Sequence, residues 1–282
     1  MTVHVVTDST ADIPADIARE LRIDVVPLTI SFGDERYRDG IDLTADEFYE
    51  RLALTKVLPT TSLPPPALFR YAYEHLSSRG DVVSVHLSHK FSGTVNTASS
   101  AAAEVAPDRI SVVDSGSASM GLGLCVIAAA RAARDGASRE ECARVAEETS
   151  RQVHVAVAFE TLDFLRRGGR IGRATAFLGG MLRLKPILTV KDGETHPLSR
   201  ARSRGKAIEE LLSLATSFEE VSDIVVLHTT TPEDAERLAE RARQARPDAR
   251  FVVGRFGPVL GVHGGPGMLG IAVAAQDRRD EV

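Results

Sequence analysis

The stretch Asp81-Val-Val-Ser-Val-His-Leu-Ser-His-Lys-Phe-Ser-Gly-Thr94 sets an apolar run directly before a turn that is rich in hydroxyl groups. Residues 81–87 are mostly valine and leucine, which favour a buried strand. Residues 88–94 then supply serines, a glycine and a lysine, and a helix is predicted from 94 to 105. A buried strand followed by a helix is the unit from which parallel sheets are built, so this stretch indicates an α/β fold.

The same alternation runs through the first half of the chain. Strands are predicted at 4–8, 23–32, 81–87 and 110–114, and helices at 14–21, 42–54, 64–76, 94–105, 117–134 and 138–151. The last of these helices opens with Ser138 and Glu141, the spacing of a capping box. We therefore predict a first domain over residues 1–152, with a mostly parallel sheet and flanking helices.

The second half has a different pattern. Strands are predicted at 153–159, 186–190, 195–201, 223–229, 250–256 and 270–274, and helices at 161–167, 204–217 and 232–245. Asp192-Gly193 suits a type I′ turn, which predicts a hairpin. We therefore predict a second domain over residues 153–282, of the α+β kind, with a layer of strands and a layer of helices. The glycine-rich stretch after residue 256 is predicted to be a loop.

Composition restricts the class of protein. The chain has 282 residues, 43% of them hydrophobic, and a net charge of −5, which argues against a general nucleic-acid binder. Cys125 and Cys142 both fall in predicted helices, which argues against a disulfide framework or a thiolate metal site. The chain opens directly into a strand and has no apolar run of about 20 residues, so we expect a cytoplasmic protein.

Four segments with hydroxyl groups are candidates for a ligand site: 7–10, 60–62, 88–94 and 114–116. Three of them follow predicted strands, and ligands of parallel sheets gather beyond the carboxyl ends of strands. Taken singly, Ser62 and Ser92 are well placed to cap helices. Taken together, hydroxyls and backbone N–H groups at converging helix starts favour a small anion such as a carboxylate or phosphate.

A serine nucleophile is the competing interpretation. It needs a base within hydrogen-bond reach, and the motif G-x-S-x-G is absent. Ser9 or Ser92 could serve if a distant histidine came close, and the candidates are His196, His228 and His263.

Two further motifs are weaker grounds for a ligand site. His86 and His89 have no carboxylate or cysteine at a spacing that suits a metal, so no metal site is predicted. The glycines at 265, 267 and 270 match G-x-G-x-x-G, but no room for the rest of a dinucleotide fold follows them.

Residues 166–206, called the basic segment here, hold eleven basic residues and two acidic ones. Their net charge of +9 leaves −14 for the rest of the chain. Such a field can steer an acidic partner, a phosphate-bearing ligand or an anionic membrane surface. Phe177 is the sole aromatic residue in the segment, which argues against base stacking on nucleic acid.

Several motifs together resemble the DegV family of bacterial lipid-binding proteins. They are Thr7-Asp-Ser9, Thr60-Thr-Ser-Leu-Pro64, Ser88-His-Lys-Phe-Ser-Gly-Thr94, Val113-Asp-Ser115, Leu162-Asp-Phe-Leu-Arg-Arg-Gly-Gly-Arg-Ile-Gly172, Lys185-Pro-Ile-Leu188 and Gly261-Val-His-Gly-Gly-Pro-Gly267. The resemblance implies two α/β domains that hold one long-chain fatty acid between them. It also implies a non-catalytic carrier without a cofactor, which presents the acid to a separate ATP-dependent kinase for acyl phosphate formation in phospholipid synthesis.

The resemblance also implies roles for single residues. Thr61 and Ser92, with Ser62 and Gly93 beside them, bind the fatty acid carboxylate, and His263 lies near the head group. The implied kinase-docking or membrane-facing residues are Arg170, Arg173, Arg202 and Arg204. Leu63-Pro-Pro and Gly264 depart from the usual family pattern. A serine-dependent esterase or thioesterase, and a lipid-sensing regulator, remain the alternative functions.

Overall fold

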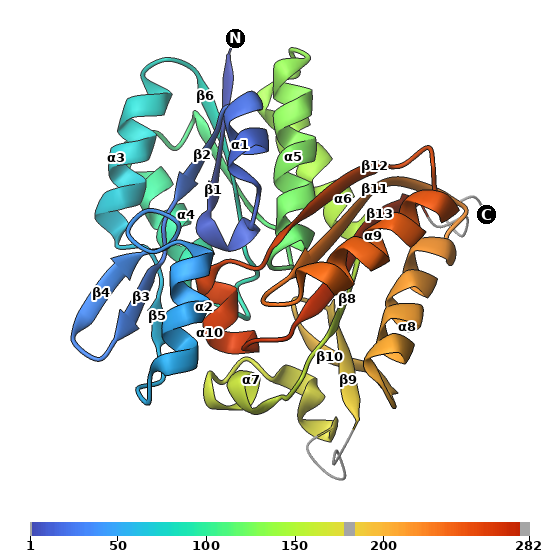
Figure 1. Cartoon of the computed structure of the whole chain (residues 1–282). Helices are drawn as coiled ribbons and strands as arrows, with labels where there is room; N and C mark the ends of the chain where they lie inside the picture. Colours follow the sequence, from blue (N-terminus) through green and yellow to red (C-terminus); the bar gives the residue numbers. More distant parts are fainter. Residues whose placement is uncertain (1, 178–183, 277–282) are drawn as a thin grey trace. The chain divides into compact units, whose positions relative to one another are not determined.

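The structure is a computed structural model that describes residues 2–177 and 184–276. The chain forms two compact units (Figure 1). Unit 1 comprises residues 1–44 and 57–151, and unit 2 comprises residues 45–56 and 152–282.

Unit 1 is built on a sheet in the order β2-β1-β6-β7, in which each pair of neighbours is parallel. Its strands are β1 (Val3–Asp8), β2 (Ile23–Val26), β6 (Asp81–His86) and β7 (Ile110–Asp114). Its helices are η1 (Ser9–Ala11, a 3-10 turn), α1 (Ala15–Glu20), α3 (Pro66–Ser77), α4 (Thr94–Val105), α5 (Met120–Arg134) and α6 (Arg139–Gln152). The capping box is confirmed, because Glu141 N donates to Ser138 Oγ and Ser138 N donates to Glu141 Oε2.

The core of unit 1 lies between this sheet and the helices that connect its strands. Phe69 and Tyr73 of α3 are fully buried against Val6 and Val82 of the sheet, together with the alanines of α4. Small residues on α4 let the helix approach the strands closely. The parallel sheet with helices beside it confirms the predicted architecture.

A second, small sheet in unit 1 has the order β4-β3-β5. Its antiparallel strands are β3 (Thr29–Phe32), β4 (Glu35–Arg38) and β5 (Thr60–Ser62). The prediction of a single strand over 23–32 is wrong. The strand is interrupted at Pro27, and its two halves lie in different sheets. Proline has no N–H for a sheet ladder. Strands β4 and β5 were not predicted, since both are short and mostly polar.

Unit 2 is a mixed sheet in the order β10-β9-β8-β13-β11-β12 within the described residues. Its strands are β8 (Val153–Ala158), β9 (Lys185–Lys191), β10 (Glu194–Ala201), β11 (Glu220–His228), β12 (Arg250–Arg255) and β13 (Leu269–Gln276). Neighbours are antiparallel except β11 and β12, which are parallel. The predicted hairpin is confirmed: Asp192 and Gly193 have φ of 50° and 78°, the left-handed values that a type I′ turn requires.

The helices of unit 2 are α2 (Ala45–Leu54), α7 (Asp163–Arg167), η2 (Gly172–Phe177, a 3-10 turn), α8 (Arg204–Thr216), α9 (Pro232–Ala245) and α10 (Pro258–Gly264). Helices α8 and α9 bury their apolar stripes on the sheet, with Leu211 and Leu238 packed against Ile224 and Ile271. The loop predicted after residue 256 is wrong, because Pro258 begins a short helix there. Proline suits the first turn of a helix.

Helix α2 groups with unit 2, although its position in the sequence predicted that it belongs to the first domain. Its aromatic residues explain why: Phe48 and Tyr49 are buried, and Tyr49 Oη donates to the carbonyl oxygen of Phe256 at 3.0 Å. A side chain at Gly261 of α10 has no room, because its Cβ would lie 2.5 Å from Phe48 Cε1. The division into domains at residue 152 stays a prediction.

Candidate functional site

The hydroxyl-rich segments of unit 1 meet at the carboxyl edge of its parallel sheet. Strands β1, β6 and β7 are neighbours, so the turns that follow them start side by side. Asp8, at the end of β1, accepts a hydrogen bond from Leu87 N, just after β6, at 3.2 Å. Ser88 N in turn donates to the carbonyl oxygen of Ser117, after β7, at 2.8 Å. The turns after β1, β6 and β7, which contain three of the four predicted segments, are therefore linked by hydrogen bonds.

Ser92 lies half-buried in the turn before α4. Its hydroxyl lies 2.9 Å from the hydroxyl of Thr94, and its backbone N–H donates to the carbonyl oxygen of Ser88 at 3.2 Å. The N-cap of α4 is Gly93, which has no side chain to cap the helix. The interpretation of Ser92 as the helix cap is therefore wrong, and its hydroxyl is placed at the start of a helix with a second hydroxyl beside it.

Thr61 and Ser62 lie in β5, which pairs with β3. Thr61 is half-buried and Ser62 is exposed, as alternation along a strand requires. Ser62 does not cap α3, because the N-cap of that helix is Pro65. The next residue, Leu63, approaches the Ser92 turn closely: a Cβ added to Gly93 would lie 3.3 Å from Leu63 Cδ2. The structure thus brings the segment after Thr61 beside Gly93.

A buried row of polar side chains supports this edge, and it was not predicted from the sequence. Tyr73 Oη donates to Ser84 Oγ at 2.8 Å, Ser84 Oγ lies 2.7 Å from His86 Nε2, and His86 Nδ1 lies 2.9 Å from Asp8 Oδ2. All four side chains are fully buried. The signal that could have found it is the polar pair Ser84 and His86 within an otherwise apolar central strand.

Ser84, His86 and Asp8 are hydrogen-bonded in the order of a catalytic triad. Their burial denies a substrate access to Ser84. The serines proposed as nucleophiles have other partners. Ser9 Oγ accepts from Leu28 N at 3.1 Å and hydrogen-bonds Asp39, and Ser92 pairs with Thr94. Among the described residues, the hydrogen bonds of Ser9 and Ser92 include no histidine.

Asp39 stands out among the carboxylates of this unit. It is buried at the end of β4, with 5% of its surface exposed. Burial raises the pKa of Asp39 to about 7, while the hydrogen bond to Ser9 opposes the shift and the charge of Asp8 adds to it. Near neutral pH this carboxyl group is therefore divided between its two protonation states.

His263 lies in α10 of unit 2, half-buried beside the glycine pair that follows α7. A Cβ at Gly168 would lie 2.3 Å from His263 Nδ1, so only glycine leaves room for the ring. Burial, and after it the charge of Arg170, lowers the pKa of His263 to about 4. The imidazole is therefore neutral at physiological pH and can donate one hydrogen bond and accept another.

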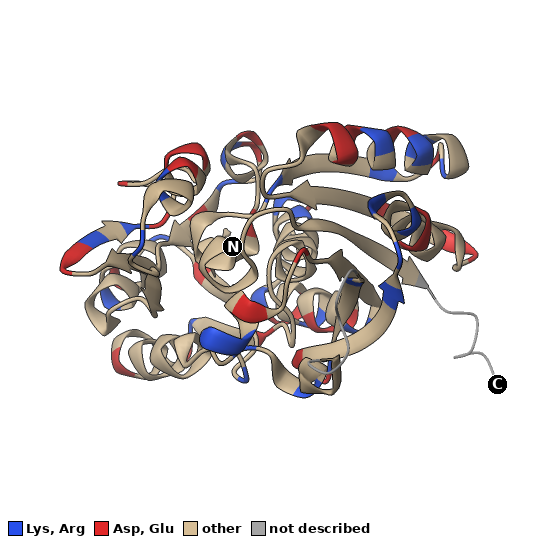
Figure 2. Cartoon of the chain, turned by 60° about the horizontal axis from the view of Figure 1, so that its bottom comes forward, with Lys and Arg blue, Asp and Glu red and all other residues tan. Residues whose placement is uncertain are grey.

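The arginines of the basic segment lie in different environments. Figure 2 colours all Lys and Arg of the ribbon blue and all Asp and Glu red. Arg170 is half-buried and donates from Nη1 to the carbonyl oxygen of Gly168 at 2.6 Å. Its charge contributes to the lowered pKa of His263. It therefore groups with the histidine rather than with an exposed surface. Arg183 lies outside the described residues.

Arg204 is enclosed by its own unit. Its guanidinium donates to Asp234 Oδ2 at 2.8 Å, to the carbonyl oxygen of Gly267 at 2.8 Å and to Thr231 Oγ1 at 2.9 Å. These bonds occupy all three guanidinium nitrogens, and only 21% of the side chain is exposed. Its geometry is that of an internal clamp on the turn after α10.

Arg173 and Arg202 are exposed. Arg173 Nε lies 3.1 Å from Glu194 Oε1, a pair in which the arginine side chain is 72% exposed. Arg202 makes no hydrogen bond or ion pair with any residue that the structure describes. These two residues can meet a partner without first breaking an internal network.

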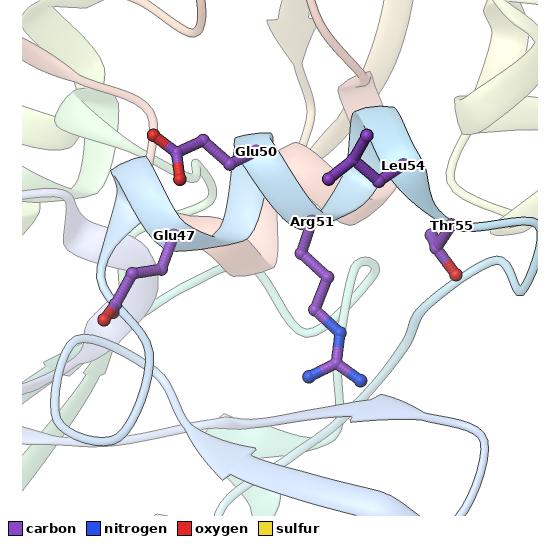
Figure 3. Close-up of a pocket in the computed structure, with 5 residues that line it drawn as sticks. All are labelled: Glu47, Glu50, Arg51, Leu54 and Thr55. Atoms are coloured by element: carbon purple, nitrogen blue, oxygen red, sulfur yellow. The ribbon is translucent and has the colours of Figure 1, made fainter.

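An open hollow of about 450 Å³ lies against α2 in unit 2 (Figure 3). Its lining residues all come from α2 and the residue after it: Glu47, Glu50, Arg51, Leu54 and Thr55. Two carboxylates against one guanidinium give the lining a net negative charge, which does not favour the predicted carboxylate head group.

Among the described residues, no helix combines the length and the apolar character that crossing a bilayer requires.

Known proteins resemble this chain over nearly its full length. The sequence profile described as "Uncharacterised protein, DegV family" matches residues 2–276. A DegV domain-containing protein of Streptomyces coelicolor is 39% identical, with 97% of this chain and 99% of that protein covered.

Two crystal structures share the fold. A DegV family protein from Thermus thermophilus, described in terms of fatty acid binding, superposes with a TM-score of 0.91 and 35% identity, covering 98% of this chain and 100% of that one. DegV from Bacillus subtilis, described as a fatty acid binding protein, superposes with a TM-score of 0.89 and 34% identity over the same shares.

Proposed function

This chain belongs to the DegV family, and from that premise we propose that it binds a long-chain fatty acid and presents the carboxylate to a separate ATP-dependent kinase. The observation that carries the proposal is the hydroxyl-rich edge of unit 1, where Ser92 and Thr94 stand at the start of α4. The likeness to solved structures described as fatty acid binding supports it.

The proposed head-group ligands are hydrogen-bond donors rather than charges. A buried carboxylate is costly unless donors surround it, and hydroxyls and helix-start N–H groups are suitable donors. We propose that Ser92 and Thr61 bind the carboxylate, that Ser62 lies beside them, and that Gly93 permits close approach of the ligand. We further propose that His263, neutral because of its lowered pKa, lies near the head group. We group Arg170 with His263, because the charge of Arg170 lowers the pKa of that histidine.

The hydrocarbon tail supplies most of the proposed affinity. Each buried methylene contributes roughly 0.8 kcal/mol, so a tail of about sixteen carbons gives on the order of 10 kcal/mol before the costs of binding. The polar contacts then determine which end of the ligand reaches the hydroxyl edge.

The protein itself carries no catalyst in this proposal. The kinase transfers the phosphoryl group from ATP to the carboxylate, and the carrier contributes binding and orientation without a cofactor. We place the protein in the cytoplasm because that is where ATP meets such a kinase. Arg202 and Arg173 are the proposed docking residues, because both are exposed. An anionic membrane surface is a further transient partner for these charges.

Identification of the co-purifying lipid tests the binding proposal. Native and denaturing mass spectrometry should show a fatty acid released on unfolding, and a fluorophosphonate should leave the serines unlabelled. Ser92→Ala should weaken palmitate binding roughly 5- to 150-fold, the range expected for a buried group left without a donor. Ser99→Ala is the matched control, because Ser99 is an exposed serine on α4. Equal affinity of the two variants would contradict the assignment of Ser92.

The docking proposal is tested separately. With the lipid still bound, Arg173→Ala/Arg202→Ala should slow kinase-dependent acyl phosphate formation. The control is Arg243→Ala, since Arg243 is an exposed arginine on α9 that pairs with Glu236. If both variants support the kinase equally, the basic segment is not the docking surface.

A further inference from the structure

We infer that Asp8 and Asp114 are positioning residues that hold the backbone of the Ser92 turn in the geometry that receives a carboxylate. The inference rests on the proposed function of Ser92 and adds to it two residues that touch no ligand. We use "head-group turn" for residues 87–92.

The head-group turn has a partner inside unit 1 for each of its six backbone N–H groups. Two of these N–H groups donate to carboxylates at the ends of neighbouring strands. Leu87 N donates to Asp8 Oδ2 at 3.2 Å, and His89 N donates to Asp114 Oδ2 at 3.2 Å. The four others donate within the turn or to its neighbour: Ser88 N to Ser117 O, Lys90 N to Ser88 Oγ, Phe91 N to Ser88 O and Ser92 N to Ser88 O. No peptide of the turn can rotate without losing a bond.

Asp8 holds the turn from inside the core. Its Oδ2 also lies 2.9 Å from His86 Nδ1, and its Oδ1 accepts from the backbone N and the hydroxyl of Thr10 at 3.1 and 2.5 Å. His86 is in turn fixed by Ser84 and Tyr73. Because all these side chains are buried, the position of the carboxylate is determined by the packing of the sheet.

Asp114 holds the turn from the solvent side. Its Oδ2 lies 2.6 Å from His89 Nδ1, and its Oδ1 accepts from Gly116 N at 2.8 Å. The carboxylate therefore links the end of β7 to the turn that follows β6. Its side chain is 27% exposed, whereas that of Asp8 is fully buried, so we expect Asp114→Ala to disturb the core less than a change at Asp8.

The two carboxylates leave a defined set of donors for a ligand. The backbone N–H groups of the turn are already used, so the turn itself contributes the Ser92 hydroxyl to recognition, beside Thr61 and the start of α4, where Gly93 supplies no cap. Donors held in place before binding lose little freedom when the ligand arrives. Loss of either carboxylate should therefore weaken binding of the carboxylate head group and leave the contacts of the hydrocarbon tail unchanged.

The test compares two ligands that share a tail, palmitic acid and 1-hexadecanol, in direct binding measurements. Asp114→Ala should raise the Kd for the acid about 5- to 30-fold, the effect of one or two hydrogen bonds, and change the Kd for the alcohol less than about twofold. Asp108→Ala, an exposed aspartate before β7, is the matched control and should change neither.

Asp8→Asn should likewise raise the Kd for palmitic acid relative to the Kd for 1-hexadecanol. If it fails to fold, the result for Asp114→Ala decides. Equal weakening of acid and alcohol, or no change in either, overturns the inference and assigns the carboxylates to stability alone. Failure of the unaltered protein to bind palmitic acid instead overturns the proposed function, and with it this inference.

Discussion

The hydroxyl edge of unit 1 and the basic segment of unit 2 began as comparable sequence patterns and folded into opposite outcomes. The edge draws residues from three distant segments into one hydrogen-bonded group, as the bonds from Leu87 to Asp8 and from Ser88 to Ser117 show. The basic segment is continuous in sequence, yet its arginines separate into an internal clamp at Arg204, a neighbour of His263 at Arg170 and an exposed residue at Arg202.

The difference comes from what each pattern is attached to. The hydroxyl turns follow parallel strands, and parallel strands bring their carboxyl ends to one edge. The arginines are distributed over a turn, a hairpin and a helix start, which point in different directions. A cluster of charge in sequence is therefore weaker grounds for a surface than a repeated position in a sheet.

The sharpest test of the comparison is Arg204→Ala. We expect a loss of about 3 kcal/mol in the free energy of unfolding, because Asp234 and the Gly267 carbonyl lose their partner. Arg202→Ala should change it by less than about 0.5 kcal/mol, as for other exposed positions. Urea unfolding measures both. Equal effects would mean that the arginines of the segment are not divided as described.

Asp39 tests the electrostatics of the hydroxyl edge. Its folded pKa of about 7 lies above the ordinary carboxyl value, so the folded state binds the proton more tightly. The resulting stabilisation is complete below the unfolded pKa and is lost as the pH rises through about 7. Relative to Asp39→Asn, the wild-type protein should lose about 2 kcal/mol of unfolding free energy between pH 5 and pH 7. Parallel pH profiles in urea unfolding would contradict the assignment.

Gly168→Ala tests the contact on which the position of His263 depends. The added Cβ meets His263 Nδ1, and we expect a loss of about 1.5 kcal/mol from overpacking. The same change in a His263→Ala background should cost less, because the ring is gone. Gly205→Ala is the control, since a Cβ there enters open space in α8. Equal costs in both backgrounds would show that the ring is not the obstacle.

The smallest effect is expected at Arg173. Its pair with Glu194 is mostly exposed, so Arg173→Ala should change the free energy of unfolding by less than about 1 kcal/mol. The difference should shrink further in 0.5 M salt, which screens exposed charges. A salt-independent cost above that range would place Arg173 with Arg204 as an internal residue.

Prediction from sequence was most accurate where a local rule acts alone. Helices α4 and α9 occur over the predicted residues, and the Asp192-Gly193 turn has the expected backbone. It failed where distant contacts decide. Ser92 and Ser62 resemble helix caps, but the helices begin after Gly93 and Pro65, and β5 forms because β3 is available to pair with it.

The sequence alone determined the family, the alternation of strands and helices, and the hydroxyl groups at strand ends, because periodicity, turn residues and motifs are local properties. The tertiary structure decided which of these groups meet. It brought Asp8 to the head-group turn, enclosed Arg204, and moved α2 into unit 2 through Phe48 and Tyr49. Hydrogen bonding and burial between segments far apart in the chain depend on how the strands are ordered, and no local pattern contains that order.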